Sequence, residues 1–342
     1  MKIEPLIIGD LTIDIPVLLA PMAGYTTPPF RRICRKLGSG LCFTEMVPVE
    51  GIKRRLPQTM VYLESTPQER PLGAHIYGTD PEVFAQAARV IGSLGRFDLI
   101  DINCGCPARK IAGKGAGVAL MKEPEKIRSI VRSTVEASSL PVTVKTRIGI
   151  SRDSGDIREV ARAIEDGGAS AITIHARLAS QRHSGPVNYE ALRQIKAERS
   201  IPIIGNGGIR NAQYAEEMLS RTGVDGLMIG QGAIGNPWIF REIRCSLTGE
   251  WYTPPSASEL MEVIAEHLRG LHDLMQIKNS LRKRPNSQPE RLTCEAFRGH
   301  LRRYLRGMKG TKRLQGSLMR HESIEDLIFA VNEILAGEES GE

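Results

Sequence analysis

Polar residues that can do chemistry stand where short apolar runs of this sequence end. Cys104 and Cys106 lie in the sequence Asn103-Cys104-Gly105-Cys106-Pro107, directly after the run 99–103. Gly105 and Pro107 favour a sharp turn, so we expect Cys106 to project from a loop, where a thiol can act as a proton donor or nucleophile, and Cys104 to face inward. Two thiols in this spacing also fit a redox pair. Zinc needs four ligands, and no second close Cys/His cluster is present, so we expect no metal.

A cation ends the run 142–147, whose sequence is Val-Thr-Val-Lys-Thr-Arg. Lys145 would be a costly charge in a buried strand unless it has an anionic partner. A ligand anion, such as the reduced form of a flavin ring, would supply one. The alternative is a salt bridge to Glu45 or to another carboxylate of the same domain.

Glycines follow two later runs, in Gly205-Asn206-Gly207-Gly208-Ile209 and in Gly230-Gln231-Gly232-Ala233. Glycines allow backbone N–H groups to approach an anion closely, and the last two loops of a βα barrel are its usual phosphate site. Glycines at such turns are otherwise ordinary turn residues.

The elements that must position these residues form a repeating pattern. Eight short β-rich runs recur along the chain, at 17–20, 41–45, 72–77, 99–103, 142–147, 171–175, 203–206 and 227–230. Helix-like stretches separate them, at 28–37, 81–94, 124–137, 157–166, 189–198 and 211–219. This pattern predicts an α/β fold, a TIM (β/α)8 barrel, in preference to an open doubly wound sheet. Residues 4–16 are predicted to form a hairpin that caps the bottom of the barrel.

The periodic strands stop near residue 245, and 251–255 has the composition of a linker. We therefore predict a barrel at 1–245 and an all-helical domain at 246–342, with helices at 259–275 and 295–308. Residues 278–320 carry 13 Lys or Arg against two acids, a net +11, whereas the whole chain carries +7. This concentration favours phosphate binding by the helical domain, although a basic helix face can also be simply solvated.

Composition excludes several classes of protein. The 342 residues are 41% hydrophobic and 25% charged, with no run of about 20 apolar residues, which is typical of a soluble protein that does not span a membrane. Six cysteines in a chain of this length do not predict a disulfide scaffold. The first residues lack the pattern of a secretory signal, so we expect a cytoplasmic protein.

Several motifs together resemble one family. They are Ala20-Pro21-Met22-Ala23-Gly24, Thr44-Glu45-Met46, Asp101-Ile102-Asn103-Cys104-Gly105-Cys106-Pro107, Gly115-Ala116-Gly117, Val144-Lys145-Thr146-Arg147-Ile148-Gly149, Ile174-His175-Ala176-Arg177, Gly205-Asn206-Gly207-Gly208-Ile209 and Gly235-Asn236-Pro237-Trp238-Ile239-Phe240. In this order, over about residues 5–245, the chain resembles the tRNA-dihydrouridine synthase (Dus) family, nearest its bacterial B-type members. The segment Phe297-Arg298-Gly299-His300-Leu301 to Gly310 is more loosely similar to the helical RNA-binding domain of that family.

The resemblance implies an enzyme that uses FMN to reduce the C5=C6 bond of uridine in tRNA, with NADPH as the reductant of the flavin. It implies that Cys106 gives a proton to C5 while the flavin delivers hydride to C6. The residues it places around FMN are Pro21, Met22, Ala23, His75, Lys145, His175, Asn206, Gly207, Gly208, Gly230 and Gln231. The residues it places near the RNA are Asn103 and Arg177, together with Arg298, Arg302 and Arg303 of the basic segment.

Three positions depart from the family's usual residues. His75 stands in place of a glutamine, Gln231 in place of an arginine beside the phosphate, and Ala176 in place of a glycine. Without that arginine the phosphate needs another cation, such as Arg210. Two alternatives stay open: a flavin enzyme acting on a free pyrimidine, similar to dihydroorotate dehydrogenases, and an RNA-binding member of the family with altered catalysis.

Overall fold

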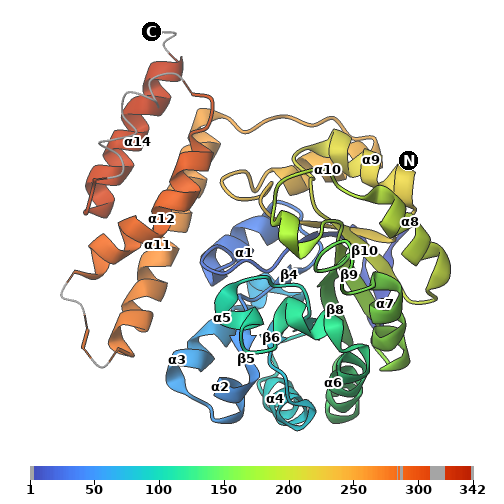
Figure 1. Cartoon of the computed structure of the whole chain (residues 1–342). Coiled ribbons are helices and arrows are strands. Elements are labelled where there is room, and N and C mark those ends of the chain that lie inside the picture. The colour runs from blue at the N-terminus through green and yellow to red at the C-terminus, as the bar shows by residue number, and fades with distance from the viewer. Residues whose placement is uncertain (1–3, 283, 286–287, 309–319, 340–342) are drawn as a thin grey trace.

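A closed parallel barrel forms the larger part of the computed structural model, which describes residues 4–282, 284–285, 288–308 and 320–339 (Figure 1). Its strands are β3 (Val17–Leu19), β4 (Cys42–Phe43), β6 (Leu72–Tyr77), β7 (Leu99–Asn103), β8 (Val142–Arg147), β9 (Ala171–His175), β10 (Ile203–Asn206) and β11 (Gly226–Ile229). They pair in the order β3-β11-β10-β9-β8-β7-β6-β4. A parallel bridge between Leu18 and Leu41 closes the ring. The predicted TIM barrel is therefore confirmed.

One predicted strand differs from the structure. The run 41–45 was expected to be continuous, but β4 ends at Phe43 and a separate strand, β5 (Val47–Pro48), pairs further along β6. At the interruption the Glu45 side chain turns toward Gly24, 21 residues away in the sequence, and accepts a hydrogen bond from its N–H, with 2.6 Å between the atoms.

Helices surround the barrel, and most begin at the residues that the sequence predicts. The long ones are α1 (Pro28–Lys36), α4 (Pro81–Ser93), α6 (Pro124–Ala137), α7 (Ile157–Asp166), α8 (Tyr189–Glu198), α9 (Ala212–Thr222) and α10 (Ile239–Thr248). Asp80, Asp156, Asn188 and Asn211 accept backbone N–H groups at four of the N-termini. Short helical turns that the sequence pattern does not predict fill the loops: α2 (Val49–Lys53), α3 (Pro57–Met60), α5 (Arg109–Ala112), η1 (Val61–Leu63), η2 (Pro67–Glu69), η3 (Gly117–Lys122) and η4 (Ala179–Gln181).

The predicted N-terminal hairpin consists of β1 (Leu6–Ile8) and β2 (Leu11–Ile13). Its side chains Leu6, Ile8 and Ile13 are buried in one apolar cluster with residues of the barrel interior. A side chain at Gly9 would collide with Pro141, which directly precedes β8. The hairpin therefore closes the amino-terminal end of the barrel, and the opposite end is free for a site.

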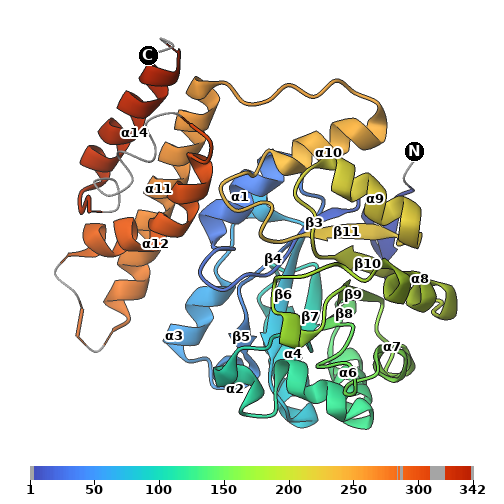
Figure 2. The ribbon, with the colours of Figure 1, turned by 45° about the horizontal axis from the view of Figure 1, so that its top comes forward.

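A helical part stands beside α1, as Figures 1 and 2 show. It contains α11 (Ala257–Ser280), α12 (Pro289–Tyr304) and α14 (Ile324–Glu339), and an extended segment, 250–256, leads to it from the end of α10 at Thr248. Its apolar core continues into the barrel through Ile33 and Leu37 of α1 and through Trp238. Within the part of the chain that the structure describes, no helix is long and apolar enough to cross a membrane.

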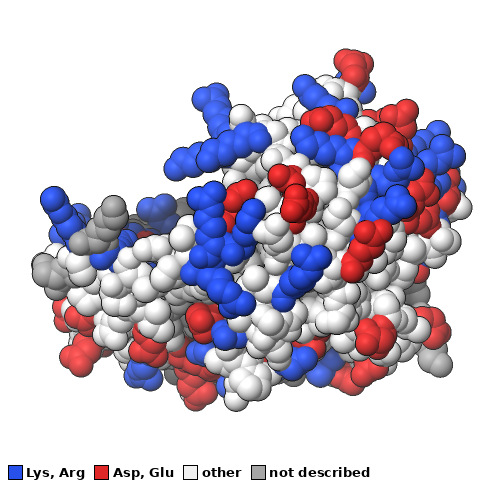
Figure 3. Space-filling view, turned by 90° about the horizontal axis from the view of Figure 1, so that it is seen from below, with Lys and Arg blue, Asp and Glu red and all other residues white. Residues whose placement is uncertain are grey.

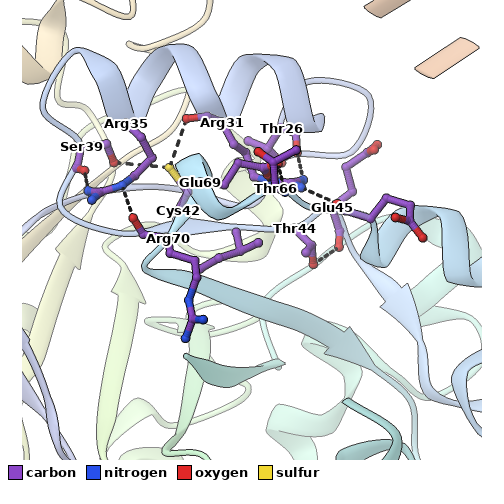
Figure 4. Close-up of polar contacts among 12 residues, drawn as sticks. Thr26, Arg31, Arg35, Ser39, Cys42, Thr44, Glu45, Thr66, Glu69 and Arg70 are labelled. Carbon is purple, nitrogen blue, oxygen red and sulfur yellow. Dashed lines mark hydrogen bonds and ion pairs between the residues drawn. The ribbon is translucent and has the colours of Figure 1, made fainter. Parts of the chain in front are cut away.

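A buried ion pair fixes α1 and the loop before it (Figure 4). Arg31 Nε and Glu69 Oε2 lie 2.6 Å apart, and both side chains are almost fully buried. The Arg31 guanidinium also donates to the carbonyl oxygens of Thr26 and Glu64. Thr26 Oγ1 in turn accepts the backbone N–H of Met22. The ion pair therefore holds the loop that carries Met22, and breaking such a buried pair is costly.

Candidate active site

The carboxyl ends of the strands enclose a cavity of ≈ 1650 Å³ that the helical part borders on one side. Most of the residues predicted to bind a ligand line it, namely Pro21, Met22, Ala23, His75, Asn103, Cys106, Lys145, His175, Arg177, Asn206, Gly207, Gly208, Gly230, Gln231 and Arg303. Arg298 and Arg302 do not line it, although they lie on the same helix, α12, as Arg303. The fold thus brings residues from every part of the barrel to one chamber.

The cavity has a thiol end, which we define by Cys106, Asn103 and Arg147. Asn103 Oδ1 accepts the backbone N–H groups of both Gly105 and Cys106, each at 3.0 Å. The Asn103 Nδ2 group lies 2.9 Å from Met46 Sδ. Cys106 is partly exposed and lines the cavity, whereas Cys104 is buried and burial raises the pKa of its thiol. The amide of Asn103 therefore fixes the loop that carries the Cys106 thiol.

Arg147 supports the same loop from β8. Its guanidinium donates to the carbonyl oxygens of Gly105, Leu178 and Arg182, at 3.0, 3.2 and 2.9 Å. Burial lowers its pKa to about 10, and the nearby Cys106 thiol acts in the opposite direction. The predicted site omits this residue. Side chains of a strand alternate in direction, so its place two residues after Lys145 was a signal that could have identified it.

Lys145 faces the cavity without a carboxylate partner. Its ammonium group donates to Asn206 Oδ1 at 3.0 Å, and Asn206 Nδ2 donates to the carbonyl oxygen of Met228 at 2.7 Å. Among the described residues Lys145 forms no ion pair; Glu45, the alternative partner considered above, pairs with Lys278 of α11 instead. Burial, and then the charge of Arg147, lower the pKa of Lys145 to about 8. This environment suits a residue whose partner is a bound anion.

His75 belongs to a buried chain of hydrogen bonds at the base of the cavity. Its Nδ1 lies 2.6 Å from Asp101 Oδ2, and Thr143 Oγ1 donates to Asp101 Oδ1 at the same distance. Because the carboxylate can only accept, Nδ1 carries a proton and Nε2 is the ring nitrogen left for a ligand. His75 also lines the cavity.

His175 is the last residue of β9, Arg177 follows the strand, and the two side chains lie side by side. Arg177 Nη1 lies 3.5 Å from His175 Nε2, and Arg177 Nε donates to the carbonyl oxygen of Gly185 at 3.0 Å. Burial first, and then the charges of Lys145 and its neighbours, lower the pKa of His175 far below its ordinary value. The imidazole is therefore neutral, and it can accept a hydrogen bond or donate one to a ligand.

The other end of the cavity, which we call the anion end, is formed by the loops after β10 and β11. Gly207 and Gly208 both have positive φ, at +115° and +80°, and a Cβ on Gly207 would collide with the His175 ring. A Cβ on Gly232 would collide with the carbonyl oxygen of Ile209, so the two loops lie against each other. Within the described residues, the backbone N–H groups of Gly207, Gly208, Gln231 and Gly232 have no hydrogen-bond acceptor. Four such donors beside a cationic rim fit the phosphate group of a cofactor.

The cavity is also bordered by cations that the predicted site did not include, namely Arg109, Arg182 and Arg306. Part of the predicted basic segment forms ion pairs with carboxylates of the same chain: Lys278 pairs with Glu45, and Arg291 pairs with Glu295 and Glu322. Lys283, Lys309, Lys312 and Arg313 lie outside the described residues.

Figure 3, a view from below Figure 1, shows Lys and Arg gathered over the middle of that face, with most acids toward its edges.

No group of three or more His, Cys, Asp or Glu side chains is arranged to hold a metal ion within the described ranges of the chain. The chemistry available in the cavity is that of a thiol beside two cations, a neutral imidazole, and backbone donors for an anion. This combination suits a bound anionic cofactor and a proton donor.

Two solved structures share the barrel. Histamine dehydrogenase from Rhizobium sp. 4-9 aligns with a TM-score of 0.54 and 14% identity, over 78% of this chain and 50% of its own. A variant of morphinone reductase in complex with tetrahydroNAD aligns with a TM-score of 0.51 and 11% identity, over 71% of this chain and 90% of its own. At these identities the likeness shows the fold alone.

Sequence relatives show more. The model of the family described as dihydrouridine synthase (Dus) matches residues 18–326. A tRNA-dihydrouridine synthase B from Pseudomonas syringae pv. tomato is 36% identical over 266 residues, 78% of this chain and 79% of the relative. Another from Salmonella typhimurium is 41% identical over 272 residues, 78% of this chain and 83% of the relative. The resemblance is confirmed, and the chain belongs to the dihydrouridine synthase family of flavin-dependent enzymes.

Proposed function

We infer that this protein reduces uridine in tRNA to 5,6-dihydrouridine in the cytoplasm, with FMN as its bound cofactor and NADPH as the reductant. The observation that carries this function is the shared cavity: the Cys106 thiol and the unpaired backbone donors of Gly207, Gly208 and Gln231 open into the same chamber. The relatives named tRNA-dihydrouridine synthase B support the choice of RNA over a free pyrimidine.

The residues around the cavity fit FMN. The loops after β10 and β11 would hold its phosphate through Asn206, Gly207, Gly208, Gly230 and Gln231. Lys145 and His175 would lie along the cofactor, and Pro21, Met22, Ala23 and His75 would contact the ring. A Cβ on Gly230 would lie only 3.7 Å from Met22 Sδ, so the loop that carries Met22 and the loop after β11 are neighbours. When bound, the flavin supplies the hydride that the C6 carbon of uridine must accept.

Cys106 would donate the proton that C5 of the uracil ring requires. Free thiols are largely protonated at neutral pH, so a thiol is a competent acid there. The negative charge of a Cys106 thiolate acts to raise the pKa of both Lys145 and Arg147. These two cations would stabilise the thiolate that the proton transfer leaves.

Asn103 would act as a positioning residue. The resemblance places it near the RNA, and in the structure its Oδ1 accepts two backbone N–H groups of the Cys106 loop. The amide therefore contributes by keeping the thiol at a fixed point of the cavity. Its Nδ2 group, now against Met46, is the part left to contact a base.

The helical part would bind the RNA. A uridine must leave its stack to enter the cavity, which costs a few kcal/mol, and phosphate contacts offset this cost. Exposed cations for such contacts include Arg282, Arg284, Arg302 and Arg306. Arg298 and Arg302, which do not line the cavity, stay proposed RNA contacts, while Arg177 borders the cavity and lies nearer the cofactor loops.

The test uses the full-length protein, an unmodified tRNA transcript and NADPH. We expect the purified protein to carry a flavin absorption spectrum or to acquire one with added FMN, and the transcript to gain dihydrouridine, detected by nucleoside mass spectrometry. A matched reaction with dihydroorotate and an electron acceptor addresses the free-pyrimidine enzyme. Turnover there with an unchanged transcript would refute the proposal, as would a protein that binds no flavin.

A further inference from the structure

The two loops of the anion end differ in the cations they have available. Arg177 covers the β10 loop, since its Nη1 and Nη2 lie 3.5 and 3.7 Å from the positions of a Cβ on Gly207 and Gly208. The β11 loop itself offers no charge, because Gln231 is neutral and exposed. Arg210, the other barrel cation at this end, borders the cavity, but its guanidinium lies over the Tyr214 ring, with 4.9 Å between Cζ and the ring centroid. Arg177 is therefore the barrel guanidinium that lies against the glycines of the β10 loop, and the β11 loop lacks an equivalent.

A residue of the helical part fills this position. Arg303 lies in the last turn of α12, lines the cavity, and donates from Nη1 to the carbonyl oxygen of Gln231 at 2.9 Å. The described residues include no carboxylate that forms an ion pair with Arg303. A guanidinium has five N–H donors, so this one bond leaves the others for an anion.

The position of Arg303 is fixed by backbone packing. A Cβ on Gly235 would lie 2.5 Å from Arg303 Cβ and from the backbone nitrogen of Tyr304, so α12 touches the chain just after the β11 loop. Gly235 has a φ of +66°, which also favours glycine. Trp238 Nε1 and Arg241 both donate to Glu259 of α11, at 2.8 and 2.9 Å, and hold the helical part to the barrel nearby. The guanidinium is therefore carried by a rigid contact between the two parts of the chain.

We propose that Arg303 binds the phosphate group of the cofactor, so that the cofactor site is completed by the helical part. The inference rests on the proposed function, since it takes FMN as the cofactor, and it reassigns Arg303 from the RNA to the flavin. Arginine suits the role because its planar fork matches phosphate oxygens. By linkage, FMN then strengthens the docking of α12 on the barrel.

The experiment compares FMN with riboflavin, which has the same ring and no phosphate. Dissociation constants are measured by flavin fluorescence on the full chain after removal of bound flavin. For Arg303→Gln we expect FMN affinity to fall about tenfold or more and riboflavin affinity to stay within about twofold, because only the phosphate contact is lost. Arg302→Gln, a neighbouring exposed cation outside the cavity, is the matched control and should bind both flavins like the wild-type protein.

A second variant guards against a general effect on folding. In the double variant Arg303→Gln with Gln231→Arg, the loop supplies its own guanidinium, and we expect most of the FMN affinity to return. Equal losses for FMN and riboflavin in Arg303→Gln, or FMN affinity equal to that of Arg302→Gln, would overturn the role of Arg303 while leaving the proposed function intact. A wild-type protein that binds neither flavin would instead overturn both.

Discussion

The thiol end and the anion end of the cavity are built in opposite ways. At the thiol end one atom, the Cys106 sulfur, is the proposed proton donor, and its loop is held by two side chains. Asn103 Oδ1 accepts the backbone N–H groups of Gly105 and Cys106, and Arg147 donates to the carbonyl oxygen of Gly105. At the anion end the proposed binding of a phosphate involves many backbone donors and several cations. They come from the loops after β9, β10 and β11 and from α12.

The two ends should therefore respond differently to single substitutions. A proton donor must lie at one position relative to the substrate, so neighbouring residues cannot replace it when it is removed. An anion site spreads its free energy over many contacts, so the removal of one contact weakens binding by a modest factor. We therefore expect large effects of single changes at the thiol end and graded effects at the anion end.

The largest effect should come from Cys106→Ala. Removal of the proton donor should lower the rate of dihydrouridine formation about 100-fold or more. FMN affinity should be nearly unchanged, because Cys106 is not among the residues proposed to hold the cofactor. Single-turnover kinetics on tRNA measure the rate. Cys104→Ala is the matched control, since Cys104 is buried away from the cavity. Activity of Cys106→Ala at the level of this control would mean that the thiol end is not catalytic.

A smaller effect should come from Arg147→Lys. Lysine keeps the charge, but its single nitrogen cannot replace the two nitrogens of Arg147, of which Nε bonds Gly105 and Nη1 bonds Leu178 and Arg182. We expect the rate to fall roughly tenfold and the free energy of unfolding to fall by about 1–3 kcal/mol. Urea denaturation and tRNA kinetics measure these, and Arg158→Lys on the surface is the control. A variant that loses stability but keeps the full rate would show that Arg147 does not position the thiol.

The smallest and most graded effect should appear in the pH dependence of FMN binding. Burial lowers the pKa of Lys145 to about 8, so in the ligand-free protein its amine becomes neutral above that pH. An anionic ligand favours the ammonium form, so binding takes up a proton above pH 8 and FMN affinity should fall by up to about tenfold per pH unit there. Below pH 7 the amine is already charged, and Lys145 should add no pH dependence.

Lys145→Met supplies the comparison for this titration. The variant should bind FMN more weakly at pH 7 and should lack the proton uptake, which calorimetry in buffers of different ionisation enthalpy detects. Ionisation of the flavin itself affects both proteins equally. Parallel pH profiles for the two proteins would contradict the role of Lys145 as a charge at the cofactor.

Much of the fold could be predicted because its signals are local. The strands at 72–77, 99–103, 142–147, 171–175 and 203–206 have the predicted bounds, since each is a short apolar run between turn residues. The run 17–20 differs from β3 by one residue at one end, and the run 227–230 differs from β11 by one residue at each end. The run 41–45 is divided, and the contact between Glu45 and Gly24 at the break joins distant residues. In the helical part, α11 extends beyond the predicted 259–275 at both ends, and α12 begins at Pro289, before the predicted 295.

The barrel, the loop that carries Cys106, the glycine loops and the family can be identified from the amino-acid sequence, because each depends on residue types at fixed short spacings. The partners of these residues became known from the three-dimensional fold: Asn206 for Lys145, three carbonyl oxygens for Arg147 and the β11 loop for Arg303. Lys145 and Asn206 are 61 residues apart, and Gln231 and Arg303 are 72 apart. Contacts over such separations depend on how strands close into a barrel and where a helix docks, which local patterns of residues do not encode.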